Sequence, residues 1–151
     1  FKALRRIVEA FEDVAVVFPM HKNPAVRTPA MEILGGHPRI LLLEPMEYLP
    51  FCHLMNESYM ILTDSGGLQE EAPALGKPVL VLRDNTERPE AVEAGTVQLA
   101  GTDQENIYRA AAELLLDEEA YQLMARAINP YGDGHACERI IAALEKWGSS
   151  R

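Results

Sequence analysis

Two short runs of residues have the types and the spacing that could bind an anion. The first, TDSGGLQEEAP at residues 63–73, places Ser65, Gly66 and Gly67 between an apolar run typical of a strand and a helical pattern. The first N–H groups of a helix have no partner within the helix, and the helix dipole adds partial positive charge there. Glycine has no Cβ to hold an anion away from those N–H groups. The pattern therefore predicts a phosphate or diphosphate site.

Arg88 and Glu71 are the side chains expected to complete this site. Arg88 lies in the second run, TERPE at residues 86–90, and its guanidinium presents paired N–H donors that match phosphate oxygens. Glu71 follows Gly66 by roughly one and a half helical turns, so its carboxylate could accept hydrogen bonds from both hydroxyls of a ribose. The alternative for Arg88 is a surface ion pair with Glu87 or Glu90, which flank it.

Ser65 is not expected to act as a nucleophile, although the segment DSGG superficially matches trypsin-like proteases. Those enzymes are all-β and have a glycine where Thr63 stands here, and the GxSxG pattern fails at the same position. Cys52 and Cys137 lie far apart and show neither CxxC nor Cys/His spacing, so no metal site or disulfide is predicted. We therefore assign no catalytic residue and no metal ligand in this chain.

The elements that must position these residues alternate in type along the chain. Apolar runs predict strands at residues 14–18, 39–43, 59–63, 79–82 and 96–100, and helical patterns lie at 1–11, 24–34, 47–56, 67–75 and 90–94. Such alternation predicts an α/β fold with a doubly wound, Rossmann-like parallel sheet. Ligands bind such sheets beyond the carboxyl ends of the strands, which is where both runs lie.

The chain is expected to be helical from residue 103 onward. A capping box of Thr102 and Glu105 is expected to open the first of these helices, and a second helix is expected at residues 117–128. The turn NPYGDG at 129–134 then breaks the pattern. The last helix is expected at 135–147, with Ile140, Ile141 and Leu144 as its buried stripe.

Composition indicates one globular domain spanning residues 1–151. Hydrophobic residues make up 48% and charged residues 25%, which excludes a disordered or fibrous protein. No run reaches the roughly 18 apolar residues of a membrane span, and no signal-peptide pattern is present, so a cytoplasmic location without membrane contact is expected. The net charge of −9 argues against a nucleic-acid partner. It does not argue against a small anion, because salt screens surface fields beyond about 8 Å.

Four stretches together resemble one known family. TDSGGLQEEAP, TERPE, NPYGDGHA at 129–136 and FPMHKNPAVR at 18–27 resemble the C-terminal half of the non-hydrolysing UDP-N-acetylglucosamine 2-epimerases, over nearly the whole chain. The resemblance implies one UDP-binding domain of a GT-B-like, two-domain fold, with the N-terminal catalytic domain absent. It also implies that the first strand of the sheet is missing, which would split the sheet between the strands at 14–18 and 59–63.

The resemblance implies an isomerase that interconverts UDP-N-acetylglucosamine and UDP-N-acetylmannosamine by eliminating UDP and adding it back. Such enzymes serve cell-surface polysaccharide biosynthesis, need no cofactor and are commonly homodimers when complete. In the family, the carboxylates that handle the protons come from the N-terminal domain. The chain alone is therefore expected to be inactive and to bind UDP or a UDP-N-acetylhexosamine weakly.

The resemblance also implies roles for single side chains. The arginine of TERPE, Arg88, contacts the nucleotide phosphates, and Glu71 binds the ribose. Phe51 lies beside the uracil ring, although its place in a helix also predicts a core position, and His21 lies near a second, regulatory UDP-sugar site. Two alternatives remain open: the nucleotide half of a GT-B glycosyltransferase, against which TERPE and NPYGDG argue, and a stand-alone UDP-binding module without catalysis.

Overall fold

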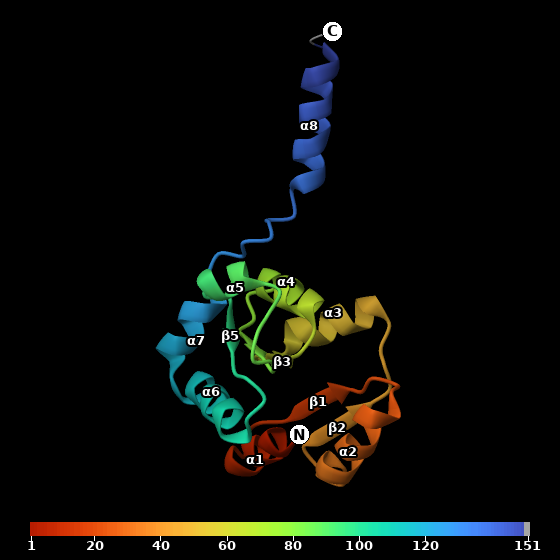
Figure 1. The fold of residues 1–151 in the computed structure, drawn as a ribbon, viewed down its shortest axis with the longest axis vertical. Coiled ribbons are helices and arrows are strands. Elements are labelled where there is room, and N and C mark those ends of the chain that lie inside the picture. Colours follow the sequence, from red (N-terminus) through yellow and green to blue (C-terminus); the bar gives the residue numbers. More distant parts are fainter. Residues whose placement is uncertain (150–151) are drawn as a thin grey trace.

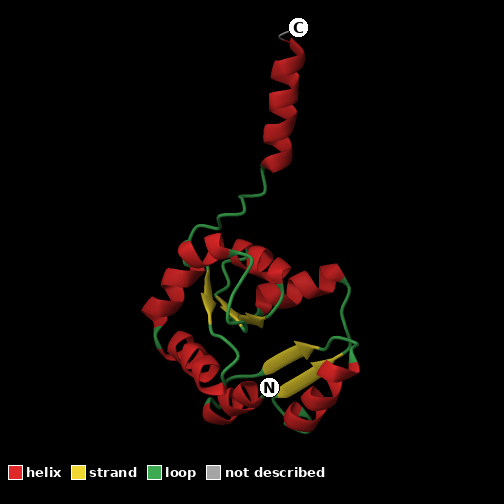
Figure 2. Cartoon of the chain, in the orientation of Figure 1, coloured by secondary structure: helices red, strands yellow, loops and turns green. Residues whose placement is uncertain are grey.

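The computed structural model of the chain describes residues 1–149, in which strands and helices alternate before a helical C-terminal part (Figures 1 and 2). The strands are β1 (Val16–Pro19), β2 (Ile40–Leu43), β3 (Ile61–Thr63), β4 (Val79–Val81) and β5 (Val97–Leu99). The helices are α1 (Lys2–Ala10), α2 (Pro24–Leu34), α3 (Tyr48–Glu57), α4 (Gly66–Ala74), α5 (Pro89–Glu93), α6 (Gln104–Leu116), α7 (Glu118–Ala125) and α8 (Ala136–Ser149). The predicted α/β alternation is confirmed.

The strands form two parallel sheets. β1 pairs with β2, with Val16 opposite Ile40, and β4 lies between β3 and β5, with Leu80 opposite Leu62 and Gln98. Within residues 1–149, β1 and β3 are not hydrogen-bonded to each other. The sheet is therefore split at the place that the sequence predicts.

Helices cover both faces of the three-stranded sheet, as a doubly wound fold requires. Leu80 of β4 faces one side and packs with residues of α1 and α6, among them Ile7, Ala111 and Leu114. Its neighbours Val79 and Val81 face the other side and pack with residues of α3, α4 and α5. The strand β4 is thus buried on both faces. The two apolar clusters fix the strands from which the loops after β3 and β4 begin.

The start of α6 corrects one prediction. Thr102 and Glu105 do not form a capping box, because Asp103 is the N-cap and its Oδ1 accepts the backbone N–H groups of Glu105 (2.9 Å) and Asn106 (3.0 Å). The carboxylate of Glu105 bonds to Nη1 of Arg6 on α1 instead (2.5 Å). Glu105 therefore joins α6 to α1 and does not take part in the predicted capping box.

The helix α8 corrects a second prediction. It projects away from the body on an extended segment (Figure 1). Its apolar stripe is not buried: Ile140, Ile141 and Leu144 are 57%, 56% and 61% exposed. The periodicity correctly predicted an amphipathic helix, but within residues 1–149 no body of protein lies against that stripe.

Candidate functional site

The strand-to-helix turn lies where the sequence places it. The helix α4 begins at Gly66, directly after β3, with Ser65 as its N-cap residue. The side chain of Ser65 makes no capping hydrogen bond; instead the backbone N–H of Ser65 donates to Oγ1 of Thr63 (3.0 Å). Ser65 and Gly67 are exposed, so the open start of the helix faces solvent. This is the geometry in which helix N–H groups bind anions.

The backbone at Gly66 lies close to two side chains of the loop after β4. A Cβ on this residue would overlap the carboxylate of Glu87 and would lie 3.9 Å from Nη2 of Arg88. On the next residue, Gly67, a Cβ would lie 3.7 Å from Oε1 of Glu71. The structure therefore places Nη2 of Arg88 and Oε1 of Glu71 beside the start of α4, and their predicted contacts with UDP stay predictions.

Arg88 forms an ion pair with a residue other than the two that flank it. Its Nε donates to the carboxylate of Glu70 on α4, and this hydrogen bond is the main reason that the pKa of Arg88 is raised. Nη1 of Arg88 donates to the backbone carbonyl of Glu87 at 3.3 Å, and Nη2 is the nitrogen that lies beside Gly66. Because a guanidinium has five N–H donors, Nη2 can donate to a further acceptor. The ion-pair alternative is correct in kind, but its partner is Glu70 rather than Glu87 or Glu90.

Glu87 places a carboxylate over the start of α4. Its Oε2 accepts a hydrogen bond from Nη1 of Arg83 at 2.6 Å. A hydrogen bond from its own backbone N–H, followed by the charges of Arg83 and Arg88, lowers the pKa of this carboxyl group. Arg83 and Arg88 together therefore favour a negative charge on the carboxylate that lies beside Gly66.

Glu71 is in contact with a tyrosine that the sequence did not single out. The hydroxyl of Tyr48, at the start of α3, lies near the thiol of Cys52 and the carboxylate of Glu71, and interaction with Cys52 and then with Glu71 raises the pKa of Tyr48 to about 12. Phe51 on the same helix is partly buried against the cluster that contains Met55 and Val79. Phe51 therefore packs at the edge of the core, and its predicted contact with uracil stays a prediction.

His21 lies in the exposed loop after β1. Its Nδ1 accepts the backbone N–H of Asn23 (3.1 Å), whose own side chain caps α2 by accepting the N–H of Ala25 (3.0 Å). His21 therefore shapes the start of α2, and its predicted place near a regulatory site stays a prediction.

Several polar contacts that join the site to its surroundings were not predicted from the sequence. The NPYGDG turn, expected only as a structural stop, is tied to the site: Nδ2 of Asn129 donates to the carbonyl of Glu70 (3.1 Å), and the hydroxyl of Tyr131 lies 3.4 Å from Oε2 of Glu90. Gln69 is fully buried between α4 and the loop that carries Arg88. These contacts could not be predicted, because the residues lie far apart in the sequence and only the folded chain brings them together.

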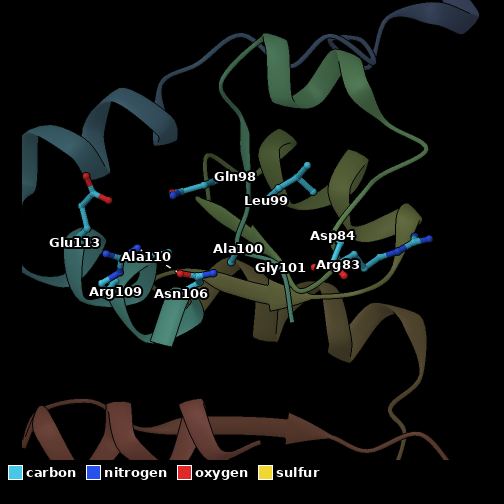
Figure 3. Close-up of a pocket in the computed structure, with 10 residues that line it drawn as sticks. All are labelled: Arg83, Asp84, Gln98, Leu99, Ala100, Gly101, Asn106, Arg109, Ala110 and Glu113. Carbon is cyan, nitrogen blue, oxygen red and sulfur yellow. Dashed lines mark hydrogen bonds between the residues drawn. The ribbon is translucent and has the colours of Figure 1, made fainter. Parts of the chain in front are cut away.

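A separate pocket of about 580 Å³ lies between the ends of β4 and β5 and the helix α6 (Figure 3). Figure 3 shows Asn106, Arg109 and Glu113 on α6 and Arg83 on the opposite side. Its lining is Arg83, Asp84, Gln98, Leu99, Ala100, Gly101, Asn106, Arg109, Ala110 and Glu113. The lining mixes charges of both signs and shares only Arg83 with the start of α4, so it does not present a uniform surface for an anion.

Two further observations concern the chain up to residue 149. No three or more His, Cys, Asp or Glu side chains gather there in a way that could hold a metal ion. None of its helices is both long enough and apolar enough to cross a membrane.

Comparison with known proteins gives consistent matches. The family model described as UDP-N-acetylglucosamine 2-epimerase matches residues 1–145. The UDP-N-acetylglucosamine 2-epimerase of Bacillus subtilis is 60% identical over 144 residues, which cover 95% of this chain and 38% of the relative. The chain therefore spans well under half the length of the relatives it matches.

Solved structures agree with the sequence matches. The UDP-GlcNAc 2-epimerase of Neisseria meningitidis, solved with UDP-GlcNAc bound, is 49% identical with a TM-score of 0.89, over 95% of this chain and 40% of that one. The S. aureus protein MnaA, solved with UDP, is 54% identical with a TM-score of 0.91, over 98% of this chain and 40% of that one.

Proposed function

The chain belongs to the UDP-N-acetylglucosamine 2-epimerase family, and from this premise we propose that it is the UDP-binding half of such an enzyme. The complete enzyme is an isomerase that interconverts UDP-N-acetylglucosamine and UDP-N-acetylmannosamine by elimination and re-addition of UDP. The observation that carries the proposal is the meeting of Arg88 and Glu71 at the open start of α4. Those groups match the charge and the hydroxyls of a nucleoside diphosphate.

In this proposal each group of the site binds one part of UDP. The backbone N–H groups of Gly66 and Gly67, together with Ser65, bind the diphosphate, and the Nη groups of Arg88 bind it from the other side. Glu71 accepts hydrogen bonds from the ribose hydroxyls. The edge of α3 that carries Phe51 then lies on the side of the nucleobase.

The same groups favour elimination as well as binding. When the bond between the anomeric carbon and the diphosphate oxygen breaks, that oxygen leaves with the electron pair and gains negative charge. Hydrogen-bond donors already aimed at this position stabilise the charge as it develops. The start of α4 and Arg88 would therefore stabilise UDP as the leaving group, and the same contacts would hold it for re-addition.

The proton transfers at C2 are assigned to the rest of the complete protein. The chain spans 38% of the length of its Bacillus subtilis relative, so most of the complete protein lies outside it. In this proposal the missing first strand of the sheet lies between β1 and β3, and the exposed stripe of α8 packs on another part of the complete protein. A homodimer in the cytoplasm is the expected state of the complete enzyme.

Calorimetric titration of UDP into the chain tests the binding site. We expect saturable binding that weakens by about tenfold or more in Arg88→Ala, because hydrogen bonds to charged groups are the stronger ones. Arg109→Ala is the matched control, since Arg109 lies in the separate pocket and should leave the affinity unchanged. Equal losses in the two variants would mean that general positive charge, rather than this site, attracts UDP.

Turnover assays separate the proposal from its alternatives. The isolated chain should not convert UDP-N-acetylglucosamine, whereas the complete protein should produce UDP-N-acetylmannosamine without any acceptor sugar. Turnover by the chain alone would contradict the proposal that the proton transfers need the rest of the complete protein. A complete protein that bound UDP but produced no epimer would point to a non-catalytic module, and a requirement for an acceptor would point to a glycosyltransferase.

A further inference from the structure

Gln69 is a polar side chain with no access to solvent. It lies in the second turn of α4 and is 0% exposed. A carboxamide loses its hydrogen bonds to water when it is buried, so its placement is unfavourable unless the protein supplies partners. The partners here come from the two sides of the proposed diphosphate site.

One side is the turn at the start of α4. Nε2 of Gln69 donates to the backbone carbonyl of Ser65 at 3.2 Å. This bond ties the side chain to the residue that precedes the two glycines, and so fixes the turn against the body of its own helix.

The other side is the loop that carries Arg88. Oε1 of Gln69 accepts a hydrogen bond from the hydroxyl of Thr86, and the same hydroxyl oxygen accepts the backbone N–H of Arg88 at 3.0 Å. The hydroxyl of Thr86 thus donates to Gln69 and accepts from Arg88, as a hydroxyl group can do at the same time. A continuous chain of hydrogen bonds runs from the backbone of Arg88 to the backbone of Ser65.

The direction of this chain fixes the orientation of the carboxamide. If the amide of Gln69 were turned over, its oxygen would face the carbonyl of Ser65, and two acceptors would be buried together. A leucine could fill the space, but it would leave the carbonyl and the Thr86 hydroxyl without these partners. The interaction therefore specifies one relative position of the turn and the loop.

We propose that Gln69, acting through Thr86, is a positioning residue that sets the distance between the N–H groups at the start of α4 and the guanidinium of Arg88. The two groups of donors come from separate segments of chain and can bind one diphosphate together only at a fixed separation. Gln69 touches neither UDP nor the reacting atoms. The inference rests on the proposed function, because it assigns a role within the same UDP site.

Calorimetric titration of UDP tests the inference with a set of matched variants. Gln69→Leu removes both hydrogen bonds, Thr86→Val removes the hydroxyl, and Thr86→Ser restores it. We expect Gln69→Leu and Thr86→Val each to weaken UDP binding by about tenfold. Thr86→Ser should bind UDP like the original chain.

Two comparisons distinguish positioning from a general loss of stability. The double variant Gln69→Leu/Thr86→Val should lose no more affinity than the weaker-binding single variant, because both changes break one chain of hydrogen bonds. Leu114→Ala, in the apolar cluster on the other face of the sheet, should lower the melting temperature while the remaining folded protein keeps its UDP affinity.

The outcomes are distinct. If the original chain binds UDP and Gln69→Leu or Thr86→Val binds it equally well, the positioning role is overturned and the UDP site stands. Additive losses in the double variant would overturn the connection through Thr86. If the original chain does not bind UDP, the proposed function itself fails, and this inference fails with it.

Discussion

Positive and negative groups alternate around the start of α4. Arg88 is held by Glu70, and Arg83 is held by Glu87, whose carboxylate lies over Gly66. The lowered pKa of Glu87 means that this carboxylate stays ionised at neutral pH, and it loses its charge only when the pH falls through that lowered pKa. The carboxylate of Glu87 lies where it would overlap a Cβ on Gly66, so a diphosphate bound at the start of α4 would compete with its negative charge.

Replacing Glu87 tests this competition. Glu87→Gln keeps the size of the side chain and removes its charge, so we expect it to bind UDP severalfold more tightly at neutral pH. Calorimetric titration measures the change. Glu93→Gln, on the exposed side of α5, changes the net charge equally and should leave the affinity as it is. Weaker binding in Glu87→Gln would show that the carboxylate assists UDP rather than competes with it.

At the scale of elements, the order and type of the strands and helices followed from local patterns. Apolar runs of four or five residues identified β1 to β5, and α2 was predicted with the bounds that the structure gives it. The predictions were wrong where two neighbouring residues could each cap a helix, as at the start of α6. They were also wrong where a residue far away in the sequence determines the partner of a side chain. The pairing of Arg88 with Glu70 is of the second kind, because only the folded position of α4 beside the loop after β4 brings the two together.

The start of α6 gives a test at this scale. Asp103→Ala removes an acceptor of two backbone N–H groups, and loss of an N-cap costs about 1 kcal/mol of stability. We expect the melting temperature to fall by about 2–4 °C. Thr102→Ala is the matched control and should change it little, because the capping box is not formed. If the melting temperature fell further in Thr102→Ala than in Asp103→Ala, Thr102 rather than Asp103 would be the residue that caps α6.

At the scale of the whole molecule, the chain has a packed body and surfaces without a partner. Two apolar clusters hold the three-stranded sheet, while within residues 1–149 β1 and β3 are not paired with each other and α8 extends from the body (Figure 1). The sequence predicted the split sheet but not the exposure of α8. An amphipathic pattern indicates that one face of a helix is apolar, and it carries no information about what covers that face.

Two leucines, one in the packed body and one on the exposed helix α8, test this difference in burial. Leu114 on α6 is 2% exposed and Leu144 on α8 is 61% exposed. Leu114→Ala should destabilise the chain by about 2–5 kcal/mol, as large-to-small changes in cores do. Leu144→Ala should change the free energy of unfolding by less than about 0.5 kcal/mol. Chemical denaturation measures both, and an equally large loss in Leu144→Ala would show that α8 packs against the body or against a second copy.

The central claim, that UDP binds at the start of α4, is tested most directly by following backbone amide resonances during a UDP titration. We predict that the largest shifts fall on Gly66, Gly67 and Arg88, and that Gly101 and Arg109 of the separate pocket stay unchanged. This readout locates the ligand even when its affinity is low. The largest shifts at Gly101 and Arg109, or no shifts in a folded chain, would contradict the assignment of the UDP site.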